Sequence, residues 1–172
     1  MHTEVKGLVL RTVDLKESDR LITIFTEEQG IVTALAKGAR SLKSRKMSST
    51  QQFCYSSFVL YGQSDKYWVK EASLIESFFG IRNSIEGLAL AAYIVEVLAD
   101  VGVEDKEVDL LRLALNSLYA ISEEKYDFFQ AFVDEVRTGK PVFDLSIEDE
   151  LSPCRKVIWA RNNSVLVENN NK

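Results

Sequence analysis

Short apolar runs separated by polar turns mark the first eighty residues of the chain. Five of these runs are rich in β-branched, aliphatic and aromatic side chains, a composition typical of β-strands. They cover residues 5–13, 20–26, 31–37, 53–61 and 67–75. Because no helical period comes between them, the pattern predicts a small antiparallel barrel or sandwich over residues 1–80.

The spacing of apolar residues changes in the second half of the chain. From Ile85 onward they recur at intervals of three and four, which is the spacing of one helix face. A second run with this spacing covers residues 108–121, and Asp105 and Asp109 lie near its start, where a helix dipole favours acids. The fold class we expect is therefore α+β, with strands first and helices after them.

A third helical run precedes a segment without clear periodicity. Its apolar positions lie within residues 128–136, and Gly139-Lys140-Pro141 ends it. We therefore expect a helical domain over residues 81–141, joined to the strands near Phe79-Gly80. Beyond Pro141 there are only two possible strands, at 157–160 and 165–167, and we expect residues 142–172 to be partly disordered.

Composition narrows the class of protein. Hydrophobic residues make up 46% of the chain and charged residues 27%, as in globular domains. The longest apolar helical stretch contains Glu96 and Asp100, and no apolar run follows a basic N-terminal head, so we expect a cytosolic protein. Cys54 and Cys154 form no CxxC pair and His2 is the only histidine, so we expect free thiols, no metal and no catalytic cluster.

Charge is distributed unevenly along the chain. The net charge is −5, yet residues 1–80 carry eleven Lys and Arg against nine Asp and Glu, whereas residues 81–172 carry ten against seventeen. Residues 29–64 contain no acid, and their five cations fall within ten positions. These cations are Lys37, Arg40, Lys43, Arg45 and Lys46. Such a segment suits DNA phosphates, and it also suits a solvated loop; both interpretations stay open.

Aromatic residues gather on the two strands after the basic segment. They are Phe53, Tyr55, Phe58, Tyr61, Tyr67 and Trp68. Alternation places Phe53, Tyr55 and Ser57 on one face and Cys54, Phe58 and Leu60 on the other. One face must be core, so we expect most rings to be buried and one or two to lie outside, where nucleic-acid bases stack.

Two other groups of residues have structural interpretations. Glu17-Ser18-Asp19-Arg20 has adjacent carboxylates without a histidine, so we expect a turn with an ion pair to Arg20 and no catalysis. The rings at Tyr126, Phe128, Phe129 and Phe132 are expected in the core of the helical domain. A groove for an apolar peptide is the alternative.

Several motifs together resemble the RecO family of bacterial DNA repair proteins. They are VKGLVLRT at 5–12, ESDRL at 17–21, TEEQG at 26–30, AKGAR at 36–40 with SR at 44–45, WVKEA at 68–72 and AAYIVEVL at 91–98. The resemblance covers roughly residues 1–132. It implies an N-terminal five-stranded OB-fold barrel, a helical domain and a location in the bacterial cytoplasm at the nucleoid.

The resemblance also implies a function without catalytic turnover. Proteins of this family bind single- and double-stranded DNA, anneal complementary strands, and act with RecR to load RecA on strands coated by single-stranded DNA-binding protein. The DNA-contacting residues would correspond to Lys37, Arg40, Lys43, Arg45 and Lys46. The helical domain in such proteins can also receive the C-terminal peptide of the single-stranded DNA-binding protein.

This chain departs from the family pattern in its second half. Relatives are longer, and many carry a zinc ribbon with two CxxC pairs, which this chain lacks. Truncation, a frameshift and true divergence after Phe132 all produce this pattern. A rival hypothesis is a protein-interaction adaptor that uses the acidic helical half and does not bind DNA.

Overall fold

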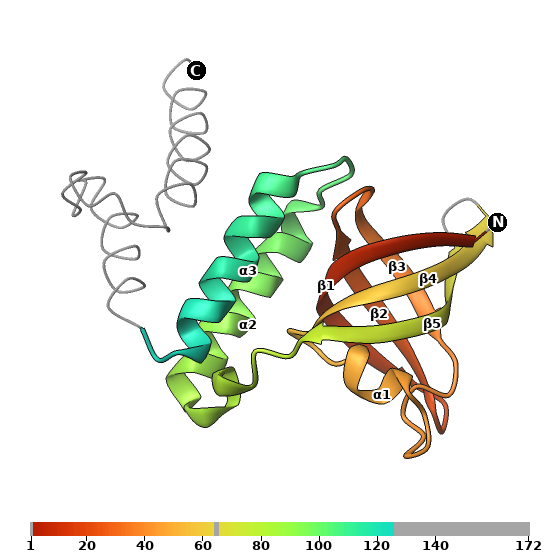
Figure 1. The fold of residues 1–172 in the computed structure, drawn as a ribbon, viewed down its shortest axis with the longest axis horizontal. Coiled ribbons are helices and arrows are strands. Elements are labelled where there is room, and N and C mark those ends of the chain that lie inside the picture. Colours follow the sequence, from red (N-terminus) through yellow and green to blue (C-terminus); the bar gives the residue numbers. More distant parts are fainter. Residues whose placement is uncertain (1, 64–65, 126–172) are drawn as a thin grey trace.

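The computed structural model describes residues 2–63 and 66–125, which form a barrel followed by helices (Figure 1). The strands are β1 (His2–Leu15), β2 (Asp19–Thr26), β3 (Gly30–Ala36), β4 (Tyr55–Gln63) and β5 (Lys66–Glu76). The helices are α1 (Lys46–Ser49), the short 3-10 helix η1 (Phe79–Asn83), α2 (Ile85–Val101) and α3 (Val108–Ser122). The predicted α+β class, with strands first, is confirmed.

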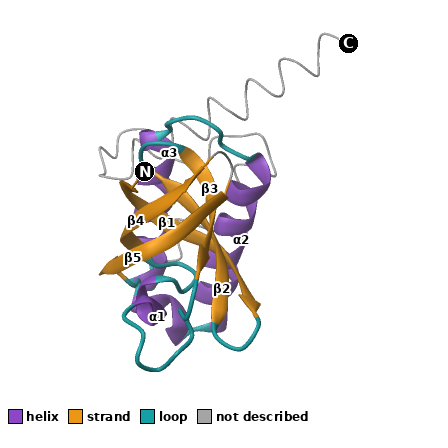
Figure 2. Ribbon diagram, turned by 90° about the vertical axis from the view of Figure 1, so that its right-hand side faces the viewer, coloured by secondary structure: helices purple, strands orange, loops and turns teal. Residues whose placement is uncertain are grey.

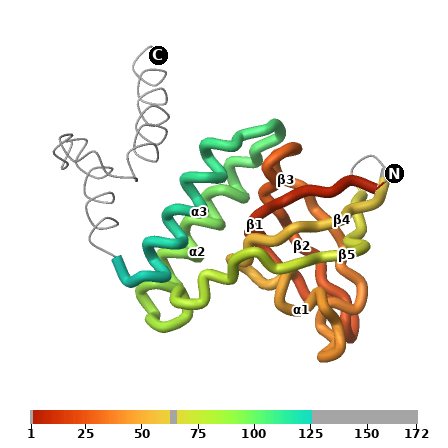
Figure 3. Tube along the Cα trace, viewed as in Figure 1, coloured from red at the N-terminus to blue at the C-terminus, as the bar shows by residue number. Residues whose placement is uncertain are grey.

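The five strands close into a barrel in the order β1-β2-β3-β5-β4. Of the two predicted architectures, barrel and sandwich, the barrel is therefore the correct one. Every neighbouring pair is antiparallel except β3 and β5, so the expectation of a wholly antiparallel sheet was wrong for this pair. The segment that contains α1 lies at one end of the barrel, and β5 rather than β4 pairs with β3 (Figure 3).

The barrel encloses its own apolar core. Side chains that alternate along the strands point inward, as the period of two requires. This interior is made of Val5, Val9, Ile22, Ile24, Ala34, Ala36, Ala39, Phe58, Leu60 and Val69, all of them buried.

A second core lies between the barrel and the helices. The barrel contributes Leu8, Leu10 and Phe25, which alternate with the inward-facing residues and therefore point outward. The helices contribute Ala91, Val95, Leu98, Leu110, Leu111, Leu113, Ala114, Leu118 and Ile121. One outer face of the barrel is thus covered by α2 and α3 (Figure 2).

The two predicted helices are confirmed, and their ends have clear causes. Ser84 caps α2, because its Oγ accepts a hydrogen bond from the Gly87 N–H at 2.9 Å. Gly102, with φ of 62°, ends α2 in the left-handed conformation that glycine adopts without strain. The short helices α1 and η1 were not predicted. The third predicted run and the possible later strands lie outside the described residues.

Polar contacts also join the two halves. The Arg11 guanidinium of β1 reaches Glu96 Oε2 and Asp100 Oδ1 of α2, each at 2.7 Å. These hydrogen bonds raise the pKa of Arg11 and lower that of Glu96. At the start of β3, the Ile31 N–H donates to the Val103 carbonyl at 2.7 Å, so the loop between α2 and α3 is held against the barrel.

The described residues contain neither a helix that could span a membrane nor a cluster that could bind a metal ion. Across residues 2–63 and 66–125, no helix has the length and apolar character needed to cross a membrane. The same residues contain no group of three His, Cys, Asp or Glu side chains that could hold a metal ion.

Candidate nucleic-acid interface

The basic loop, residues 37–46, follows β3 and is held against the turn between β1 and β2. The Gly38 N–H donates to Asp19 Oδ1 at 2.9 Å, and the Arg40 N–H donates to the Ser18 carbonyl at 2.9 Å. Gly38 has φ of 65°, a conformation that side-chain-bearing residues adopt only with strain. The chain therefore turns sharply just after β3 and returns along the β1–β2 turn.

The far end of the basic loop is fixed by α1. Lys46 begins this helix, and its Nζ donates to the Val69 carbonyl of β5 at 2.9 Å. Thr50 Oγ1 donates to the Lys46 carbonyl at 2.6 Å and so closes the helix end. The loop is thus anchored at both ends, on β2 and on β5.

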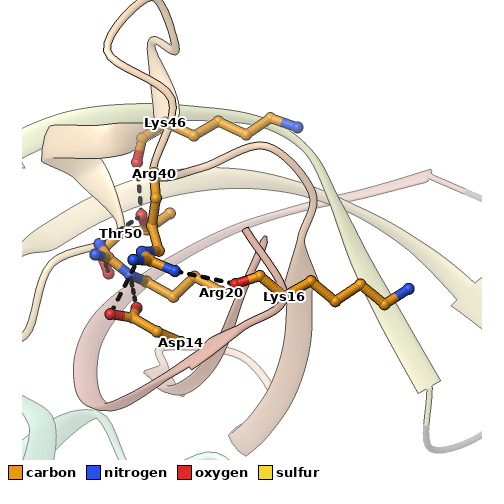
Figure 4. Close-up of polar contacts among 6 residues, drawn as sticks. All are labelled: Asp14, Lys16, Arg20, Arg40, Lys46 and Thr50. Atoms are coloured by element: carbon orange, nitrogen blue, oxygen red, sulfur yellow. Dashed lines mark hydrogen bonds and ion pairs between the residues drawn. The ribbon is translucent and has the colours of Figure 1, made fainter. Parts of the chain in front are cut away.

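One carboxylate joins two arginines beside the loop (Figure 4). Asp14 accepts from Arg20 Nε at 3.1 Å through Oδ1 and pairs with Arg40 Nε at 3.4 Å through Oδ2. Arg40 also donates to the Lys16 carbonyl at 3.4 Å. Two guanidinium charges against one carboxylate leave this cluster with a net positive charge.

The five predicted site residues therefore divide into two groups. Arg40 and Lys46 use their side chains to hold the loop in place, although neither is fully buried. Lys37, Lys43 and Arg45 are exposed, and their side chains make no ion pair or hydrogen bond within the described residues. Only this second group presents its full charge to solvent.

Two further cations lie at this end of the barrel and were not predicted as site residues. Arg20 pairs with Asp14 and donates to Thr50, and Lys16 is exposed at the β1–β2 turn. The sequence did contain a signal for them, because Glu17-Ser18-Asp19-Arg20 was expected to form a turn. That this turn lies beside the basic loop depends on barrel closure.

The ion pair expected within Glu17-Ser18-Asp19-Arg20 is formed with a different partner. The turn is present, but Arg20 pairs with Asp14, which faces it across the β1–β2 ladder. Asp19 instead accepts from the Gly38 N–H. The prediction of a turn was correct and the predicted partner was wrong, since cross-strand neighbours lie closer than chain neighbours.

Most of the aromatic rings are buried or partly buried, as expected. Phe58 and Leu60 face the barrel interior, while Phe53 and Tyr55 pack with the core under the helices. At the start of β4, both faces of the strand are therefore covered, whereas only one face was expected to be core. Tyr61, 38% exposed, stacks on Trp68 with ring centroids 5.6 Å apart and planes 21° apart.

Two ionisable groups near the second core have shifted pKa values. Burial raises the pKa of the Cys54 thiol, which is free. Burial also raises the pKa of Tyr55, and the hydrogen bond that its hydroxyl donates to the Glu27 carboxylate adds to this rise. Both groups are uncharged at neutral pH. Cys154 lies outside the described residues.

The closed five-stranded barrel with a short helix between β3 and β4 places the N-terminal half among OB-fold domains. Comparison with known families refines this class. The family model described as "Recombination protein O N terminal" matches residues 1–78. The chain belongs to the RecO family through this domain, as its sequence motifs indicated.

Individual relatives agree with this assignment. The DNA repair protein RecO of Acetivibrio thermocellus is 44% identical over 123 residues, covering 71% of this chain and 49% of the relative. RecO of Clostridium kluyveri is 36% identical over 126 residues, which cover 72% of this chain and 49% of that relative. RecO of Bacillus pumilus is 32% identical over 156 residues, which cover 90% of this chain and 59% of that relative. This alignment therefore extends beyond Phe132. The chain spans about half the length of the first two relatives.

Proposed function

We propose that this chain acts in recombinational DNA repair by binding DNA through the basic loop. The relatives are named DNA repair proteins, which supports the general role. The observation that supports this binding site is that the cations of the loop have two different roles. Arg40 and Lys46 fix its shape, and Lys37, Lys43 and Arg45 project unpaired charge into solvent. Phosphate contacts of this kind require no base recognition, so both single- and double-stranded DNA are ligands.

Strand annealing follows from the same charge. Two complementary strands repel each other, and a basic surface that neutralises phosphates on both lowers that repulsion. The proposed mediator role, with RecR and RecA at strands coated by single-stranded DNA-binding protein, rests on the family resemblance. It is a binding role without catalytic turnover, exercised in the bacterial cytoplasm. No cofactor is part of the proposal.

Fluorescence anisotropy with a labelled single-stranded oligonucleotide, repeated over a salt series, tests the site. Replacing Lys37, Lys43 and Arg45 together by Glu should weaken binding to every sequence. The slope of log affinity against log salt should become shallower by about 2, since each single-strand phosphate contact contributes about 0.7.

A matched variant separates this effect from net charge. Lys106, Arg112 and Lys125 are exposed cations of the helical half, and replacing all three by Glu changes the net charge equally. This control should retain wild-type affinity and slope to a first approximation. Equal losses in both variants would mean that overall charge, rather than the basic loop, controls binding.

The rival function is a protein adaptor, and one observation favours it. Along α2, Ile85, Tyr93, Val97 and Val101 are 86%, 60%, 42% and 44% exposed, and they recur on one face of the helix. Such an apolar stripe suits a protein partner. A well-folded wild-type protein that binds no oligonucleotide at low salt would favour the adaptor over the DNA-binding role.

A further inference from the structure

An uncovered row of apolar side chains runs across the outside of the barrel, next to the basic loop. Cross-strand pairing joins its members directly: Tyr61 of β4 faces Trp68 of β5, which faces Leu35 of β3. Leu35 in turn faces Leu21 of β2, and Leu21 faces Val13 of β1. Their chain neighbours Leu60, Val69, Ala34, Ala36 and Ile22 are buried in the barrel, so the row itself points outward.

This row is not part of either core. Val13 is 53% exposed and Tyr61 38% exposed, and Leu21, Leu35 and Trp68 are each partly exposed. The helices cover a different part of the outer surface, where Phe25 is buried. The row is therefore apolar surface that the described part of the chain leaves open.

The row and the cations of the loop lie next to each other. Lys37 comes two residues after Leu35, which places it about 7 Å farther along the same direction. Lys46 holds α1 on the carbonyl of Val69, the residue that follows Trp68. The stacked rings of Tyr61 and Trp68 thus lie beside the anchored end of the basic loop.

We propose that Trp68 and Tyr61 form a stacking platform for the bases of single-stranded DNA whose phosphates contact the basic loop. This inference rests on the proposed function and adds strand selectivity to it. Unpaired bases expose flat faces that stack on aromatic rings, whereas the bases of a duplex are already stacked on one another. Cations alone bind both forms of DNA, so the rings give the surface its preference for single strands.

Leucine substitutions at Trp68 and Tyr61 test the platform. Affinity for an oligothymidine strand should fall roughly 5- to 150-fold for each base that loses its stacking partner. The salt slope should stay unchanged because no charge is removed, and affinity for a duplex of the same length should stay near wild type. Tyr93→Leu and Tyr119→Leu are the matched controls, since these tyrosines of α2 and α3 are 60% and 54% exposed; both should bind like wild type.

The Trp68–Tyr61 pair also stabilises the sheet, so folding must be separated from binding. Trp68→Phe and Tyr61→Phe keep a flat ring and should retain most of the single-strand affinity, while a circular-dichroism melt verifies that each leucine variant is folded. A second readout uses Trp68 fluorescence in a Trp159→Phe background, where oligothymidine should quench the emission and duplex DNA should not.

The outcomes separate this inference from the proposed function. If the loop variant loses binding while folded leucine variants keep wild-type single-strand affinity, the platform is refuted and the basic loop stands. Equal losses for single and double strands also refute the platform, because the rings would then not select between them. If the wild-type protein binds neither form at low salt, the proposed function fails and the platform fails with it.

Discussion

Phe25 provides the sharpest test of how the barrel and helices depend on each other. It belongs to β2 and is fully buried, yet it packs with residues of α2 and α3 rather than inside the barrel. Its neighbour Ile24 points the other way, into the barrel core. Replacing Phe25 by Ala should leave a cavity between the two halves and cost about 3–5 kcal/mol. Domains of this size are stable by about 5–15 kcal/mol, so the loss is a large share of the total.

The assay is urea unfolding followed with one probe in each half. Trp68 fluorescence, in a Trp159→Phe background, reports on the barrel, and far-UV circular dichroism reports mainly on the helices. Both midpoints should fall together by about 2 M, taking a denaturant slope of about 2 kcal/mol/M. Tyr93→Ala is the matched control, because it removes an aromatic side chain of α2 that is 60% exposed. Its effect should stay within about 0.5 kcal/mol.

Separate transitions would contradict this coupling between the halves. If Phe25→Ala moved the helical transition and left the Trp68 transition in place, the shared core would not couple the halves. The barrel and the described helices would then be independent folding units. Coincident transitions would show that they unfold as one cooperative unit.

Two further predictions concern contacts between the halves, and a third concerns the burial of Cys54. Gly30→Ala should lower the free energy of unfolding by about 1–3 kcal/mol, because Gly30 has a φ of +69°. The loss should be larger still, since the new Cβ would lie 2.4 Å from the Val103 carbonyl oxygen. Gly102→Ala is the control: Gly102 has a φ of +62° but open space around it, so this variant should show only the cost of the backbone conformation. Because Arg11 lowers the pKa of Glu96, the ionised pair stabilises the fold above the ordinary value of 4.5, and this contribution is lost as pH falls through the lowered pKa. Urea titrations should therefore show Glu96→Gln less stable than wild type at neutral pH and equally stable in acid; a pH-independent difference would contradict this. In a variant whose other cysteine is serine, Cys54 should react with a thiol reagent only upon unfolding, and rapid labelling of the native protein would show that its burial is wrong.

The strands were predicted from their β-branched, aliphatic and aromatic composition, and the two described long helices from apolar residues spaced at three and four. Residues 20–26 were expected to form a strand, and the structure has β2 over Asp19–Thr26. The helix predicted over 108–121 is α3, Val108–Ser122. The short elements α1 and η1 escaped prediction because four or five residues are too few to establish a period.

The candidate site was predictable in location but not in detail. Clustering of cations in the chain marked the loop, since no acid lies near it in sequence. Which cations remain free depends on Asp14, a residue of β1 that reaches Arg40 only after the barrel closes. In the same way, no local pattern indicates that Lys46 bonds to the Val69 carbonyl of β5. Long-range pairing decides these roles.

The arrangement of the two halves also bears on the proposed function, in which an acidic protein binds a polyanion. The described helical residues 81–125 carry nine Asp and Glu against four Lys and Arg, so this half repels phosphates. It covers the outer face of the barrel around Leu8, Leu10 and Phe25, whereas the basic loop lies at the end where α1 is anchored (Figure 1). In the proposed function, attraction at one surface and repulsion at another would restrict DNA to the barrel surface that holds Lys37 and Trp68. The net charge of −5 is therefore compatible with the proposed placement of DNA, because the local field around the basic loop, and not the total charge, would determine where phosphates bind.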